Sequence, residues 1–138
     1  MSVGSNALNV TKHLPKAIGP REHGMIDYAH AAFFFSVALM CRKTNRPAAL
    51  AALGTGTFIL VQSLLTDYPL GVKPVISFET HGKMDAAFAS SSWMIPKVLG
   101  FSNTGAAKIF EINSAVEGTV VGMTDFNSDR ARLERATD

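Results

Sequence analysis

Long apolar stretches separated by short polar segments organise the first half of the chain. The stretch HGMIDYAHAAFFFSVALMC (23–41) has no charged residue after Asp27, and AALAALGTGTFILVQSLLT (48–66) has none at all. The polar turn RKTNRP (42–47) joins them, and its proline suits the first turn of a helix. The segment DYPLGVKP (67–74) then breaks the chain with two prolines and a glycine. This pattern predicts a helical hairpin.

The second half of the chain repeats the arrangement with weaker apolar character. The stretch AAFASSSWMIP (86–96) is only mildly apolar, and Pro96 and Lys97 interrupt it. Three charged residues occur within the stretch 106–124: Lys108, Glu111 and Glu117. We therefore predict an all-α protein of four helices, arranged as two tandem hairpins.

The two halves also resemble each other in sequence, with a period of 58 residues. Residues 23–68 align with residues 81–126 without a gap, and ten of the 46 aligned positions are identical. The opening HGMID falls on HGKMD, and the closing LTDY falls on MTDF. Because these polar matches bracket both ends of the unit, we interpret the similarity as an internal duplication. The predicted domain then consists of repeat 1 (23–68), a linker (69–80) and repeat 2 (81–126).

Composition favours a membrane location. The chain of 138 residues is 47% hydrophobic and only 17% charged, whereas soluble domains are usually about 25% charged. A helix that spans a bilayer needs about 20 mostly apolar residues, or about 17 at the short end. The stretch 48–66 meets this requirement, and 23–41 meets it if His23 and Asp27 lie near the membrane surface. We expect a four-helix membrane domain over 23–126, with a soluble four-helix bundle as the competing interpretation.

The segments outside this domain are polar, and the charges suggest an orientation. Residues 1–22 form a polar arm without the apolar run of a secretory signal peptide, and residues 127–138 form a polar tail. Eight basic residues lie on the side of the termini and the central loop, against five on the other side, which favours cytoplasmic termini. A net charge of +2 is too small to indicate nucleic-acid binding. Cys41 is the single cysteine, which excludes an intramolecular disulfide.

The motifs HGMIDY, LTDYPLGVKPVISFETHGKMD and SSWMIPKVLGF, with the closing TDF, cover about residues 23–126. Together they resemble the SPW-repeat proteins, which are small bacterial integral membrane proteins with two helical hairpins. The Ser-Pro-Trp tripeptide of that family corresponds here to SSW (91–93) in the second unit, and the first unit has FFF (33–35) instead. The resemblance implies a bacterial cytoplasmic membrane location and a two-hairpin architecture. It implies no reaction.

Histidine and aspartate recur at helical spacing in both units. His23 and Asp27 are four residues apart and share a helix face, as do His81 and Asp85. Antiparallel hairpins bring the closing Asp of each unit back to its opening, so we predict one polar cluster at one end of the bundle. Its members are His23, Asp27, His30, Asp67, His81, Asp85 and Asp125.

Three interpretations of these residues stay open. In the first, they stabilise helix ends and pin neighbouring helices, so that no ligand or catalytic residue is needed. The protein is then a non-enzymatic membrane protein, acting as a structural or accessory component of a larger membrane assembly or as a homo-oligomer. In the second, a metal ion or haem is bound by a redox protein whose candidate ligands are His23, Asp27, His30, His81 and Asp85. In the third, protons or ions move through Glu117, with Glu111 as a second intramembrane acid.

Overall fold

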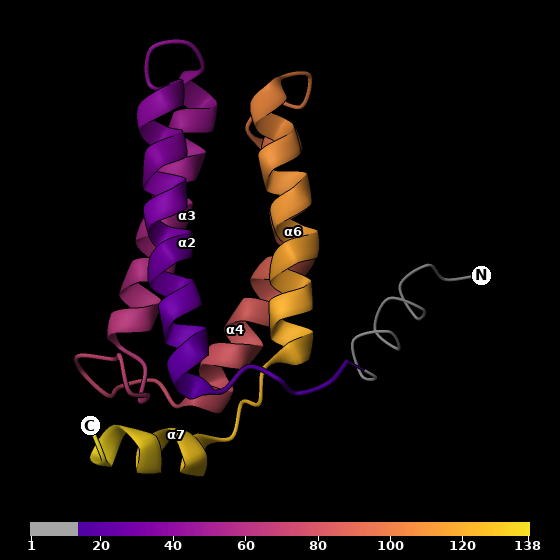
Figure 1. The fold of residues 1–138 in the computed structure, drawn as a ribbon. Helices are drawn as coiled ribbons and strands as arrows, with labels where there is room; N and C mark the ends of the chain where they lie inside the picture. The colour runs from indigo at the N-terminus through magenta and orange to yellow at the C-terminus, as the bar shows by residue number, and fades with distance from the viewer. Residues whose placement is uncertain (1–13) are drawn as a thin grey trace.

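Helices form the architecture of residues 14–138, the part of the chain that the computed structural model describes (Figure 1). No β-strand occurs among these residues, which confirms the predicted all-α class for them. The longer helices are α2 (Pro20–Cys41), α3 (Arg46–Leu64), α4 (Phe78–Ser91), α6 (Gly105–Met123) and α7 (Ser128–Ala136). Two short elements follow α4, the 3-10 helix η1 (Ser92–Met94) and α5 (Ile95–Val98). Residues 1–13 of the predicted arm 1–22 lie outside the described residues.

Local signals in the sequence set the helix ends. The side chain of Asn45 accepts a hydrogen bond from the backbone N–H of Ala48 and so caps α3. Ser77 caps α4 in the same way, and α4 therefore begins eight residues before the apolar stretch 86–96. Gly100 follows α5 with a φ of 77°, a left-handed conformation that glycine adopts without strain. Because Ser77 caps it, α4 begins before the apolar segment that hydropathy identifies.

The helices form two hairpins that stand side by side. Helices α2 and α3 make the first hairpin, and α4 with η1 and α5 returns through α6 to make the second (Figure 1). Helix α7 lies across the end of the bundle where α2 begins and α6 ends. The tips of the hairpins lie at the opposite end. This arrangement brings the openings and closings of both units to the α7 end.

Helix α7 occupies most of the predicted polar tail 127–138, and hydropathy alone did not reveal it. The side chain of Asn127 accepts a hydrogen bond of 2.9 Å from the backbone N–H of Arg130 and caps the helix. Ala131 is fully buried in an apolar cluster with Tyr68 and Phe78. Ala131 is the single buried residue of α7, so the sequence of this helix shows no apolar stripe.

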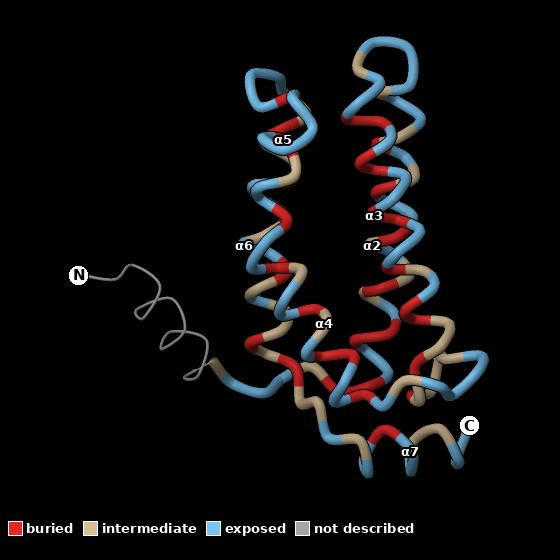
Figure 2. Tube along the Cα trace, turned by 180° about the vertical axis from the view of Figure 1, so that it is seen from behind, coloured by how far each residue is buried: buried red, intermediate tan, exposed pale blue. Residues whose placement is uncertain are grey.

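The main apolar core runs along the inner faces of the long helices (Figure 2). Phe34 of α2 and Phe110 of α6 are completely buried there, with ring centroids 5.4 Å apart. Small residues of α3, such as Ala48 and Ala52, let that helix approach α2 closely. A second, smaller cluster around Tyr68 and Phe78 lies against α7. The buried rings of His23 and His81 adjoin this second cluster, with centroids 5.5 and 5.9 Å from that of Phe78.

Positions 58 residues apart make equivalent backbone contacts. An isolated parallel bridge joins Ile18 to Thr124, and its counterpart joins Ile76 to Thr66. Each bridge connects the segment that precedes one hairpin to the closing Thr-Asp of the other. The hairpins are therefore tied to each other reciprocally at the α7 end. The internal duplication itself stays an inference from the sequence.

Two of the described helices are long and apolar enough to cross a membrane. An 18-residue window in α2 and one in α3 each reach a mean hydropathy of 1.4. Only 33% of the α2 window and 44% of the α3 window is buried in the protein. A core helix of a soluble protein passes the same test when it is mostly buried, so the low burial leaves room for lipid or a partner around both helices.

Candidate metal centre

Four buried side chains, two from each hairpin, meet near the α7 end of the bundle. They are His23 and Asp27 of α2, and His81 and Asp85 of α4. Nε2 of His23 lies 3.2 Å from Nε2 of His81, 3.0 Å from Oδ2 of Asp85 and 3.4 Å from Oδ1 of Asp27. Nε2 of His81 lies 3.4 Å from Oδ2 of Asp27 and 3.1 Å from Oδ2 of Asp85. Helical spacing of four residues places each His-Asp pair on one face.

Two threonines orient the imidazole rings. The hydroxyl of Thr66 donates to the carbonyl of Gln62 at 2.7 Å, and that of Thr124 donates to the carbonyl of Val120 at 2.7 Å. Because a hydroxyl has one hydrogen, each oxygen must accept its remaining hydrogen bond from an imidazole N–H. Nδ1 of His81 lies 2.7 Å from the Thr66 hydroxyl, and Nδ1 of His23 lies 3.0 Å from that of Thr124. Both rings therefore carry a hydrogen on Nδ1.

With the hydrogen on Nδ1, each neutral ring has an unprotonated Nε2 that can accept a hydrogen bond or bind a cation. The two Nε2 lone pairs face each other across 3.2 Å, beside the carboxylates of Asp27 and Asp85. Four acceptors in one buried space repel one another unless a cation or protons lie among them. A proton on one Nε2 would let that ring donate to Oδ2 of Asp85, which lies 3.0 Å from His23 and 3.1 Å from His81. A single cation would instead be shared by all four groups at once.

The separations are close to those of a tetrahedral ion site. Metal–nitrogen and metal–oxygen bonds of about 2.0–2.2 Å at tetrahedral angles require ligand atoms about 3.3–3.6 Å apart. The two separations to Asp27 are 3.4 Å and fall in this range, whereas the other three are 3.0–3.2 Å and would widen slightly around an ion. One suitable atom from each of the four residues lies within 4.8 Å of the others. The two Nε2 atoms are too close for a porphyrin to lie between them. The geometry thus suits one small ion rather than haem.

Each carboxylate has a further hydrogen-bond donor that holds its orientation. Tyr68 donates from its hydroxyl to Oδ2 of Asp27 at 3.0 Å. The side-chain amide of Gln62 donates to Oδ1 of Asp85 at 2.6 Å. These donors are not equivalent by the repeat, because Phe126 stands at the position matching Tyr68 and Val120 at that matching Gln62. Both aspartates are nevertheless fixed by one outer donor each, as ligating carboxylates commonly are.

The glycine that follows each histidine makes room for the aromatic residue that closes a unit. A Cβ on Gly24 would lie 3.0 Å from the Tyr68 ring, and a Cβ on Gly82 would lie 2.6 Å from the Phe126 ring. Contacts below 3.0 Å do not occur without a shift of the ring or the helix. The His-Gly pair that begins each repeat therefore packs directly against the aromatic residue that ends it.

Asp67 and Asp125, which the sequence placed in the cluster, pair with α7 instead. Oδ1 of Asp67 lies 3.8 Å from Nε of Arg135, and Oδ2 of Asp125 lies 3.2 Å from Nη1 of Arg130. Glu134 and Asp125 raise the pKa of the Arg130 guanidinium by accepting its hydrogen bonds. The prediction erred by one residue, because the backbone bridges turn the threonines, not the aspartates, toward the histidines.

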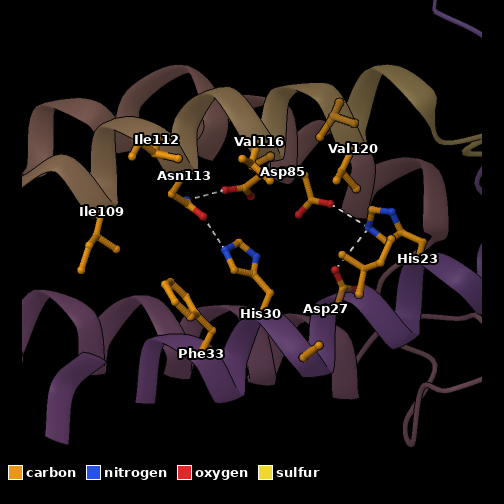
Figure 3. Close-up of a pocket in the computed structure, with 14 residues that line it drawn as sticks. His23, Asp27, His30, Phe33, Asp85, Ile109, Ile112, Asn113, Val116 and Val120 are labelled. Atoms are coloured by element: carbon orange, nitrogen blue, oxygen red, sulfur yellow. Dashed lines mark hydrogen bonds and ion pairs between the residues drawn. The ribbon is translucent and has the colours of Figure 1, made fainter. Parts of the chain in front are cut away.

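His30 also lies outside the four-residue cluster. Its Nε2 lies 2.5 Å from Oδ1 of Asn113, whose amide nitrogen donates to Oε2 of Glu117 at 3.1 Å (Figure 3). Glu117 is buried, and Asn113 is its hydrogen-bond partner. The four-residue cluster and this triad are thus two adjacent polar groups.

Glu111, the other acid singled out in the sequence, is exposed on α6. Among the described residues its side chain makes no hydrogen bond or ion pair with the buried groups, because it lies on a different face of the helix from Asn113 and Glu117.

No family model matches the chain, and neither a curated protein nor a solved structure matches it. The resemblance to the SPW-repeat proteins stays an expectation that rests on the motifs of the sequence. Function is therefore inferred from the geometry of the site.

Proposed function

We propose that the protein binds one divalent transition-metal ion through Nε2 of His23, Nε2 of His81 and the carboxylates of Asp27 and Asp85. The observation that carries the proposal is the commitment of both Nδ1–H groups to threonine hydroxyls, which points both Nε2 lone pairs into one acceptor-rich space. Metal-ligating histidines almost always donate their other ring N–H to a carboxylate, a backbone carbonyl or water, and the threonine hydroxyls take that place here. Two imidazoles and two carboxylates favour Zn²⁺, with Fe²⁺ and Mn²⁺ as further candidates.

The proposed ion has a structural role. Four side chains would complete the coordination of a tetrahedral ion, which is typical of structural metal sites, whereas catalytic sites keep a position open. Each hairpin supplies one His and one Asp, so the ion joins the two hairpins at the end where α7 covers them. This fits a non-enzymatic protein, and the ion would stabilise the contact between its halves.

The proposal includes a location in the bacterial cytoplasmic membrane, with cytoplasmic termini and four spanning helices. It is supported by the hydropathy of α2 and α3, by their low burial, and by large exposed apolar side chains along the helices. These side chains include Leu39, Leu50, Leu53, Val61, Trp93 and Ile112. Lipid or other subunits of a membrane assembly would cover them.

Cobalt substitution tests the metal centre. Co²⁺ in a tetrahedral site absorbs strongly in the visible region, whereas aqueous Co²⁺ absorbs weakly. Purified protein treated with chelator and titrated with Co²⁺ should develop the strong bands at one ion per chain, and Zn²⁺ should remove them. His30→Phe is the matched control, because it removes a neighbouring histidine that is not a proposed ligand and should leave the bands intact. Weak, octahedral-type absorption in the wild type would contradict the proposal.

A further inference from the structure

A cavity of about 470 Å³ lies between α2 and α6, directly beside the proposed metal centre (Figure 3). Its volume falls within the range of about 300–1,000 Å³ that small-molecule sites occupy. Apolar side chains form most of its wall, among them Ile26, Ile109, Val116 and Val120. Polar groups gather at its inner end, where His30, Asn113 and Glu117 line the cavity together with Asp27 and Asp85 of the metal centre.

The corresponding positions between α3 and α4 are filled instead of open. His30 and Val116 on the cavity side correspond to Phe88 and Phe58 by the 58-residue shift. The Phe58 and Phe88 rings pack together with centroids 5.4 Å apart. The cavity thus lies on the side where His30 and Val116 stand in place of the two phenylalanines. A space of this size that is both apolar and polar at one end is the usual form of a ligand site.

The hydrogen bonds at the inner end of the cavity indicate which polar group of a ligand would fit there. The amide nitrogen of Asn113 donates to Glu117, so its oxygen must accept from Nε2–H of His30. The neutral His30 ring then offers Nδ1 as an acceptor, and Nδ1 makes no hydrogen bond within the described residues. A hydroxyl group satisfies this acceptor, and because it both donates and accepts it suits Glu117 in either protonation state.

The charge of the lining residues and the position of the opening further restrict the type of ligand. No Lys or Arg lines the cavity, so an anionic head group would lose its hydration there without gaining a cationic partner. At the mouth, Phe33, Ile112 and Val116 also line the cavity and have 48%, 63% and 56% of their surfaces exposed. A ligand therefore enters from the apolar outer surface of the helices. This excludes strongly hydrated molecules.

We propose that the cavity between α2 and α6 binds an uncharged apolar alcohol or phenol, whose hydroxyl donates to Nδ1 of His30 and whose apolar body lies against α6. The cavity adjoins the metal centre, because His23, Asp27 and Asp85 also line it, but the proposed hydrogen bond is made to His30, which is not a proposed metal ligand. The proposal goes beyond the metal centre and does not require that the metal be bound.

Three aromatic probes of similar size test this proposal on the full chain in lipid nanodiscs, with empty nanodiscs as the blank. 1-Naphthol carries the hydroxyl, 1-methoxynaphthalene lacks the donor, and 1-naphthoate carries a negative charge. Saturable binding followed by probe fluorescence should be roughly tenfold tighter for 1-naphthol than for 1-methoxynaphthalene, because one hydrogen bond to a buried acceptor is lost. 1-Naphthoate should bind more weakly than both.

Variants that reproduce the filled side provide the controls. Val116→Phe should abolish 1-naphthol binding by filling the cavity, while Val61→Phe places the same ring at another half-exposed helix position outside the cavity and should bind as wild type. His30→Phe removes the acceptor and should abolish the preference for 1-naphthol over 1-methoxynaphthalene. Equal binding of these two probes by wild type, or unchanged 1-naphthol binding by Val116→Phe, would overturn the proposal.

Metal content measured in the same samples separates this proposal from the metal centre. Val116→Phe should retain the metal, so its loss of 1-naphthol would reflect the cavity alone. A wild-type protein without metal that still binds 1-naphthol selectively would contradict the metal centre and support the cavity site.

Discussion

The two hairpins make matching contacts where they meet and different contacts halfway along. At the α7 end, His23 pairs with Thr124 and His81 pairs with Thr66, and both pairs follow the 58-residue shift. Near the middle, the His30 side has a polar triad and a cavity, whereas the Phe88 side has packed rings. The matching contacts lie where the proposed metal centre needs side chains from both hairpins. The contacts that differ lie where only one side holds the cavity.

Removing a ligand from either hairpin should have the largest effect. His23→Asn and His81→Asn each delete one coordinating nitrogen, and each should lower metal affinity by more than the 10–100-fold that loss of an outer-shell partner costs. Competition titration with a chromophoric chelator measures both. Because each ring makes the same Nδ1 contact with the closing threonine of the other hairpin, the two losses should be similar. A large loss in one variant with none in the other would show that the halves are not functionally equivalent.

Removing the threonine hydroxyls should have the next largest effect. Thr66→Val and Thr124→Val keep the side-chain shape but leave Nδ1 of His81 or of His23 without its acceptor. We expect metal affinity to fall about 10–100-fold in each. Thr119→Val is the control, since that hydroxyl bonds only a backbone carbonyl at an exposed position. Unchanged affinity in both variants would contradict the tautomer assignment on which the metal site depends.

The two glycines offer a graded test of packing. Gly82→Ala brings a methyl group to 2.6 Å from the Phe126 ring, and Gly24→Ala brings one to 3.0 Å from the Tyr68 ring. Overpacking of this kind costs about 1–3 kcal/mol, partly offset by the better helix propensity of Ala. Denaturant unfolding should therefore show a larger loss for Gly82→Ala than for Gly24→Ala. Gly118→Ala, where the added methyl meets nothing, should not destabilise. The reverse order of the first two would contradict the described packing.

The arginines of α7 should show the smallest difference. Arg135 is only partly exposed, pairs with Asp67 and donates to the backbone carbonyls of Tyr68 and Gly71. Arg130 is more exposed and pairs with Asp125 and Glu134. We expect Arg135→Ala to lower the free energy of unfolding by about 1 kcal/mol and Arg130→Ala by less, because exposed ion pairs contribute little. Equal thermal shifts would indicate that the carbonyl contacts of Arg135 add no stability.

Much of the architecture was predictable because it rests on local patterns. Apolar stretches marked α2, α3 and α6, and helical spacing placed each histidine beside its aspartate. Helix α7 was missed because Ala131 is the single residue that buries it, and α4 began early because the Ser77 cap acts independently of hydropathy. These two features depend on one residue each, which gives no periodic signal.

The composition of the site was predicted only in part. The sequence grouped His23, Asp27, His81 and Asp85 correctly, since the repeat and the hairpin connections bring them to one end. It also included Asp67 and Asp125, because spacing alone does not show which of two adjacent residues turns inward. The crossed backbone bridges decide this, and they are long-range contacts that a local pattern cannot reveal.

The outer donors illustrate the same limit. Tyr68 and Gln62 hold the two aspartates from positions that the repeat does not match, so no symmetry argument finds them. His30 was grouped with the metal ligands because it continues the face of His23 and Asp27. The structure instead places its Nε2 against Asn113, a residue whose importance no motif indicated.

The most direct test of the metal centre is the metal-to-protein ratio of the full chain, measured by elemental mass spectrometry after purification without chelator. We predict one transition-metal ion per chain in the wild type and in His30→Phe, and none in the double variant His23→Asn, His81→Asn. A wild-type protein that holds no such ion, even after incubation with Zn²⁺, Fe²⁺ or Mn²⁺, would contradict the metal centre. So would a metal content that is the same in the double variant as in the wild type.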